Sequence, residues 1–119
     1  MSYIFNFEKL DVWQKARAFA KSLYMETKSF PADERFGLIS QMRRAGVSVP
    51  SNIAEGNSRT SKKEKVHFFE IAYGSLMEVM NQLIISFDLG FVTGDRLDNY
   101  KKVVSEIANK LTALRKSHL

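Results

Sequence analysis

The chain contains one Glu-x-x-His pair, formed by Glu64 and His67. On a helix this is the ligand spacing of di-iron bundles, but such sites need two of these pairs and two further inward glutamates. The other histidine, His118, stands near the C-terminus with Arg115 three residues before it, and the chain has no cysteine. Glu64 is also explained as a helix-capping residue. The ligand count therefore predicts neither a metal nor a cofactor.

General acid–base catalysis needs a carboxylate or histidine in a pocket, and Glu55 is the one candidate in an unusual setting. It lies one helical turn before Arg59, and Arg44 of a second chain could also pair with it. A structural ion pair explains it without chemistry. No Gly-rich phosphate loop, nucleophile elbow or metalloprotease motif is present. The sequence therefore predicts a protein that is not an enzyme.

Composition favours a single helical domain spanning residues 1–119. The chain is 45% apolar and has only two prolines and six glycines, a mixture typical of folded helical proteins. Its N-terminus lacks a charged segment followed by an apolar run, and no apolar run is long enough for a membrane span. We therefore expect a cytoplasmic protein. The net charge of +5 permits an acidic partner such as nucleic acid without requiring one.

Apolar residues recur at alternating steps of three and four in four segments, which places each set on one face of a helix. Short connections make neighbouring helices antiparallel. We therefore predict an all-α, up-down-up-down four-helix bundle whose second and third helices are long, about 24–28 residues. The four stripes are Trp13, Ala16, Ala20, Leu23 and Thr27; Ile39, Met42, Gly46, Val49 and Ile53; Phe69, Tyr73, Leu76, Met80, Leu83 and Phe87; and Leu97, Tyr100, Val104, Ile107, Leu111 and Leu114.

Capping residues mark the predicted helix boundaries. Asp11 with Gln14 and Ser61 with Glu64 have the spacing of capping boxes, and Phe30-Pro31 ends the first helix. The remaining signals are Asp33 as N-cap of the second helix, Gly90 as a left-handed C-terminal cap, and Thr93-Gly94-Asp95 before the fourth helix.

The second helix is predicted to continue, bent, through Pro50, because Met42, Gly46, Val49 and Ile53 keep their period across it. The proline ring would press on the carbonyl of Gly46, where the missing side chain lets the backbone bend. We expect this helix to end near Gly56, with residues 57–60 as the turn.

Short and apolar residues also cover the other sides of this helix, in the rows Gln41, Arg44, Ser48, Ser51, Glu55 and Arg43, Val47, Pro50, Ala54. A helix that is small or apolar on most sides is usually buried all round. Either a second subunit covers it, or it is buried within its own bundle, or it is merely exposed. We favour a subunit interface formed by Val47, Ser48, Pro50, Ser51, Asn52, Ala54 and Glu55.

Basic residues gather around the turn between the second and third helices. A solvated surface is the ordinary explanation, but an oligomer would multiply the cluster and attract phosphate backbone. The candidate nucleic-acid contacts are Arg43, Arg44, Arg59, Lys62, Lys63 and Lys65, and a further set, Lys101, Lys102, Lys110, Arg115 and Lys116, marks the fourth helix.

We expect the aromatic residues to pack in the core rather than to stack on nucleic-acid bases. Trp13, Phe68, Phe69, Phe87 and Tyr100 lie mostly on heptad faces. Phe5 and Phe7 precede the first helix, and we expect them either to tuck over the end of the bundle or to reach a neighbouring chain.

Several runs resemble the bacterial four-helix-bundle proteins named for 23S rRNA intervening sequences. They are FEKLDVWQ at 7–14, Phe30-Pro31, QMRRA at 41–45, AYGSLME at 72–78 and, most specific, SVPSNIAEG at 48–56. The resemblance implies a bundle that assembles into a homopentameric ring. A related branch, the accessory variability determinant of diversity-generating retroelements, is strongly basic, binds nucleic acid and partners a reverse transcriptase; this chain is less basic.

The sequence therefore favours a non-enzymatic, homo-oligomeric scaffold, pentameric by the resemblance, that binds nucleic acid through its basic surface, with RNA as the favoured ligand. The alternative is a protein–protein adaptor in which the positive charge is incidental.

Overall fold

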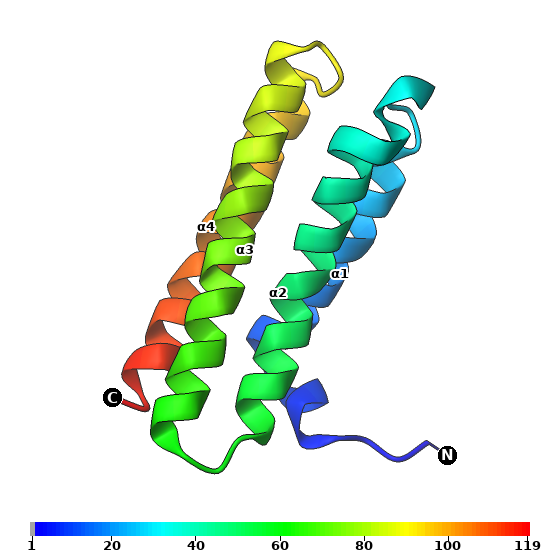
Figure 1. The fold of residues 1–119 in the computed structure, drawn as a ribbon. Helices are drawn as coiled ribbons and strands as arrows, with labels where there is room; N and C mark the ends of the chain where they lie inside the picture. Colours follow the sequence, from blue (N-terminus) through cyan, green and yellow to red (C-terminus); the bar gives the residue numbers. More distant parts are fainter. Residues whose placement is uncertain (1) are drawn as a thin grey trace.

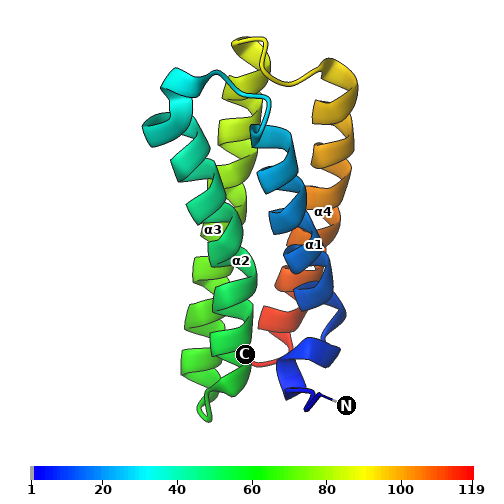
Figure 2. The same cartoon turned by 90° about the vertical axis from the view of Figure 1, so that its right-hand side faces the viewer.

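The computed structural model describes residues 2–119, and four long helices account for most of them. They are α1 (Asp11–Thr27), α2 (Ser40–Ser58), α3 (Lys62–Asp88) and α4 (Gly94–Lys116). Each helix runs antiparallel to the next, and the two termini lie at the same end as the α2–α3 turn (Figures 1 and 2). The predicted all-α, up-down-up-down four-helix bundle is confirmed.

The predicted stripes meet in one hydrophobic core. Its fully buried side chains include Leu23, Met42, Ile53, Leu76 and Ile107, each less than 2% exposed. The stripe members Tyr73 and Phe87 lie at the surface instead, 39% and 42% exposed. The expectation that Phe87 serves the core is therefore wrong. Phe19, which belongs to no predicted stripe, is 1% exposed.

A short 3-10 turn, η1 (Asn6–Lys9), precedes α1 and changes how that helix begins. The predicted Asp11–Gln14 capping box is wrong, because the N-cap is Leu10 and the Gln14 side chain instead donates from Nε2 to the Glu8 backbone oxygen. Phe7 is half-buried with its ring edge-to-face against Trp13, whereas Phe5 is 58% exposed. Only Phe7 therefore tucks against the bundle.

The second helix is shorter than predicted. A 3-10 turn, η2 (Ala32–Glu34), and a π-helical turn, η3 (Arg35–Ile39), occupy its expected first turns, and Gly37 has a non-helical backbone there (φ −109°, ψ −108°). The Glu34 carboxylate, not Asp33, accepts a hydrogen bond from the Leu38 backbone nitrogen. As a result α2 has 19 residues, while α3 has the predicted length at 27.

Through Pro50, α2 continues as predicted, and it ends at Ser58, two residues beyond the expected Gly56. Gly46 allows a close approach between helices: a Cβ there would lie 2.5 Å from Leu23 Cδ1 of α1. The role of this glycine in the packing is therefore to admit Leu23.

The caps of the last two helices agree with the sequence. Ser61 Oγ accepts from the Glu64 backbone nitrogen at 3.1 Å, and Thr93 Oγ1 accepts from that of Arg96 at 3.3 Å. Gly90 has a φ of +81°, which makes the left-handed turn after α3.

Candidate nucleic-acid interface and subunit contact

Small polar side chains form part of the seam between α2 and α3. Ser48 Oγ lies 2.8 Å from Ser75 Oγ of α3, and Asn52 Nδ2 donates to the Ser48 backbone and side-chain oxygens at 2.8 and 2.9 Å. Pro50 is buried within the chain. Three of the seven predicted interface residues therefore already contact or pack against their own bundle.

The other four predicted residues remain at the surface. Val47 is 42% exposed, Ser51 and Glu55 are exposed and Ala54 is half-buried. On α3, Ile71 and Gly74 share a side with Ser75 by helical spacing; Ile71 is 39% exposed, and a Cβ at Gly74 would meet nothing within 4 Å. We call Val47, Ser51, Ala54, Ile71 and Gly74 the outer α2–α3 face. It combines small and apolar residues, and no described residue from 2 to 119 lies within 4 Å of a Cβ placed at Gly74.

Arg43 is used inside the bundle. Its Nε donates to Thr27 Oγ1 at 2.9 Å and its Nη2 to the Tyr24 backbone oxygen at 3.3 Å, while its Cζ lies 4.6 Å from the centre of the Tyr24 ring. These contacts fasten α2 to the last turns of α1. At 1.5 Å per residue, Arg43 lies roughly 24 Å along the helix from Arg59. Arg43 and the exposed Arg44 are therefore not brought together with the four cations at the turn.

Two of the four turn cations contact their own bundle, and the other two form no ion pair with the described residues. Lys65 Nζ donates to the Asn57 backbone oxygen at 2.9 Å and so caps the end of α2. Arg59 stacks on Phe68, with Cζ 4.6 Å from the ring centre, and approaches Glu55 at 3.8 Å. Lys62 and Lys63 are exposed and form no ion pair with any residue from 2 to 119. We call Arg59, Lys62, Lys63 and Lys116, the exposed last residue of α4, the basic end of the bundle.

Most cations along the α1–α4 seam are paired. Lys15 Nζ lies 2.9 Å from Glu106 Oε1, and the hydrogen bond from Lys15 to Glu106 raises the pKa of Lys15. Lys110 lies 2.7 Å from Asp11 and, through its hydrogen bond, lowers the pKa of that carboxyl group. Of the predicted α4 cations, Arg115 pairs with Glu70 at 3.4 Å, and Lys101 and Lys102 are exposed.

A buried carboxylate joins α1 to α4 near the other end. Glu26 is 7% exposed and accepts from Arg96 Nη1 at 3.1 Å and from the Tyr100 hydroxyl at 2.9 Å. Burial, and then this hydrogen bond, raise the pKa of Tyr100. Both partners satisfy a charge that would otherwise be costly to bury. These contacts therefore link α1 to α4.

Glu64 and His67 are both exposed on α3. Within residues 2–119 no three His, Cys, Asp or Glu side chains come together as a group that could hold a metal ion. Over the same residues, no helix combines the length and apolar character needed to cross a membrane.

The fold and its exposed surfaces define a helical-bundle protein whose distinctive features are a basic end and a small-residue outer face. The chain belongs to the 23S rRNA-intervening sequence protein family, whose model matches residues 8–113. Its fold is similar to the 1.70 Å crystal structure of a protein of unknown function from the S23 ribosomal protein family of Bacteroides thetaiotaomicron. The TM-score is 0.80 at 21% identity, over 88% of this chain and 95% of that one. Among curated proteins no match was found.

Proposed function

We propose that this protein is a non-enzymatic, homo-oligomeric scaffold, a pentameric ring, that binds RNA through its basic end. The observation that carries the proposal is the exposure of Lys62 and Lys63 at the α2–α3 turn, where no carboxylate of residues 2–119 pairs with them. Membership of a family named for an rRNA intervening sequence is consistent with an RNA ligand.

Phosphate binding follows from the chemistry of this end. Each lysine that contacts a phosphate releases condensed counterions, so affinity falls steeply as salt rises. Such contacts position the nucleic acid without reading its sequence. In a ring, every subunit would present the same end, and the cations of one chain would be repeated around the assembly.

Subunit contact is assigned to the outer α2–α3 face. Val47 and Ile71 there are 42% and 39% exposed, and Ser51 and Gly74 let a neighbouring helix approach closely. Five chains of 13.6 kDa give a particle of about 68 kDa. Light scattering should report that mass, and Ser51→Arg should lower it. Ser105→Arg on the exposed side of α4 is the matched control and should leave the mass unchanged. A wild-type monomer at every concentration tested would remove the ring from the proposal.

RNA binding is tested by electrophoretic mobility shift at two salt concentrations. Lys62→Glu with Lys63→Glu should weaken binding at low salt by at least about tenfold, because two phosphate contacts become repulsive. The same double reversal at Lys101 and Lys102, also exposed neighbours, controls for net charge and should have a smaller effect. Absence of binding at low salt, or binding that salt does not weaken, would reject an RNA function of this kind.

A protein–protein adaptor is the second candidate, and the apolar residues of the outer α2–α3 face favour it. An adaptor keeps its partner after charge reversal at Lys62 and Lys63, whereas RNA binding at the basic end is lost by the same change.

A further inference from the structure

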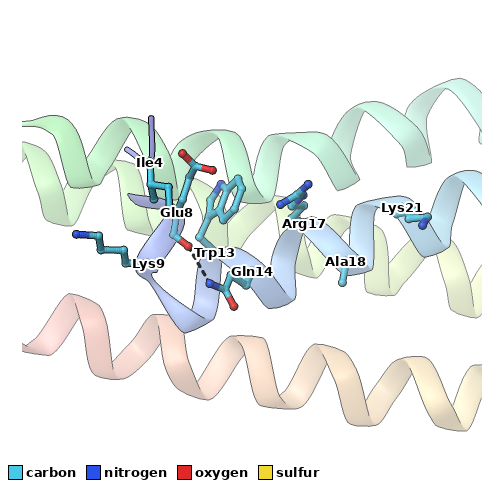
Figure 3. Close-up of a pocket in the computed structure, with 8 residues that line it drawn as sticks. All are labelled: Ile4, Glu8, Lys9, Trp13, Gln14, Arg17, Ala18 and Lys21. Atoms are coloured by element: carbon cyan, nitrogen blue, oxygen red, sulfur yellow. Dashed lines mark hydrogen bonds between the residues drawn. The ribbon is translucent and has the colours of Figure 1, made fainter. Parts of the chain in front are cut away.

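A groove with a volume of about 660 Å³ begins at the N-terminal segment and follows the exposed side of α1 as far as Lys21. Its lining includes Trp13, the only tryptophan of the chain, and three cations, Lys9, Arg17 and Lys21. Figure 3 shows Trp13 between Glu8 and Arg17, with Lys9 beyond Glu8 and Lys21 beyond Arg17. We call this feature the α1 groove.

The cations of the α1 groove differ from Lys15, which lies on another side of α1. Lys15 is paired with Glu106, whereas Lys9, Arg17 and Lys21 form no ion pair with any residue from 2 to 119. The one acidic residue in the groove, Glu8, accepts from the Phe5 backbone nitrogen at 2.7 Å and is held in the N-terminal turn. The groove therefore has an excess of unpaired positive charge.

An aromatic surface lies among these charges. Trp13 is half-buried, and Phe7 fixes its ring by an edge-to-face contact with centroids 5.0 Å apart. The Arg17 guanidinium lies 5.3 Å from the centre of the Trp13 ring. A nucleic-acid base can stack on the guanidinium plane, or on the indole once Arg17 turns to a phosphate.

The spacing also suits a chain of phosphates. Trp13, Arg17 and Lys21 are each four residues apart on α1, so they line one side of the helix over roughly 12 Å. An aromatic platform inside a positively charged groove is the arrangement that single-stranded nucleic acid uses. Rigid duplex RNA keeps its bases stacked inside and would not reach the ring.

We propose that the α1 groove binds a nucleotide, with the base stacked on the Trp13–Arg17 pair and the phosphates on Lys9 and Lys21. The nucleotide belongs to a single-stranded stretch of the RNA, so in this respect the inference rests on the proposed function. It adds a base-contacting site on α1 to the phosphate contacts of the basic end.

Fluorescence tests the proposal directly, because all tryptophan emission of this chain comes from Trp13. The full-length protein is titrated with a short oligouridylate, with uridine 5′-monophosphate and with inorganic polyphosphate, and each mixture is also run in a mobility shift. Oligouridylate should quench the emission saturably and polyphosphate should not. Arg17→Gln with Lys21→Gln, both exposed, should weaken the quenching about tenfold. Lys101→Gln with Lys102→Gln removes the same charge from α4 and should leave it unchanged.

The other outcomes separate the two proposals. A mobility shift without quenching overturns the α1 groove and leaves RNA binding at the basic end intact. Equal quenching by polyphosphate overturns base stacking. Quenching by the mononucleotide at lower concentration than by the oligomer keeps the nucleotide site but overturns its assignment to RNA. Absence of both shift and quenching rejects both proposals.

Discussion

Replacing Gly56 with alanine tests the close contact between α2 and α3. Gly56 is buried near the end of α2, and a Cβ there would lie 2.7 Å from Phe69 Cε1 and 3.0 Å from Phe68 Cβ. Phe69 is 1% exposed and its ring centre lies 5.9 Å from that of His118. The ring therefore has little room to move away from the added methyl group.

Two effects of opposite sign set the size of the change. Overpacking a filled core costs about 1–3 kcal/mol, while alanine is favoured over glycine within a helix by about 1 kcal/mol. That preference is smaller here because α2 ends two residues later, at Ser58. We expect Gly56→Ala to lower the free energy of unfolding by about 1–2 kcal/mol and Tm by about 3–8 °C.

Urea and thermal unfolding followed by circular dichroism provide the measurement. Gly74→Ala is the matched control: Gly74 lies inside α3, and its Cβ would meet nothing within 4 Å. Measured below the concentration at which chains associate, this variant should be more stable than wild type by up to about 1 kcal/mol. If Gly56→Ala is as stable as Gly74→Ala, the helices are not in the close contact described, and the reasoning is refuted.

The remaining predictions concern the links between helices. Ser48→Ala and Ser75→Ala should each cost about 1 kcal/mol, with a coupling of about 0.5–1.5 kcal/mol in a double-mutant cycle from urea unfolding; zero coupling would contradict the hydrogen bond. Because its pKa is raised in the fold by burial and by Glu26, Tyr100 favours the folded state fully below its ordinary pKa of about 10. This stabilisation is lost as pH rises above that value, since the unfolded phenol ionises first; Tm should fall less steeply with alkaline pH in Tyr100→Phe, and an unchanged slope would refute this. Arg43→Met should lower the free energy of unfolding by about 1–2 kcal/mol and leave RNA affinity at the wild-type value in a mobility shift; a large loss of affinity would restore Arg43 as a phosphate contact.

The bundle could be predicted from sequence because its core positions keep one period over many turns. Met42, Val49 and Ile53, for example, are all fully buried. Sequence reasoning failed at Gly37, which lies in the predicted first turns of the second helix but has a non-helical backbone. Periodicity reports which side chains face the core and says little about the dihedral angles that connect them.

The face opposite the core was harder to assign. Ser48 lies away from the apolar stripe, yet it bonds to Ser75 of the same chain. A helix in a four-helix bundle touches two neighbours, so a single heptad stripe cannot distinguish a contact with the next helix from one with another chain. The partner of each side chain depends on three-dimensional register, which local sequence does not contain.

The candidate binding residues show the same limit. Arg43 is close to the turn in sequence but far from it in space, because a helix extends about 1.5 Å with every residue. The α1 groove was overlooked although its signal is present: Lys9, Trp13, Arg17 and Lys21 recur every four residues. What the sequence could not show is that Lys15 pairs with Glu106, whereas Lys9, Arg17 and Lys21 form no ion pair with any residue from 2 to 119.

Both chain termini lie beside the α2–α3 turn at one end of the bundle (Figures 1 and 2). An affinity tag or fluorescent fusion at either terminus would therefore lie beside the basic end and obstruct that surface. The α3–α4 loop at the opposite end, around Gly90 and Thr93, is the better place for a label. Because the chain has no cysteine, a single introduced thiol there could be modified without touching any native residue.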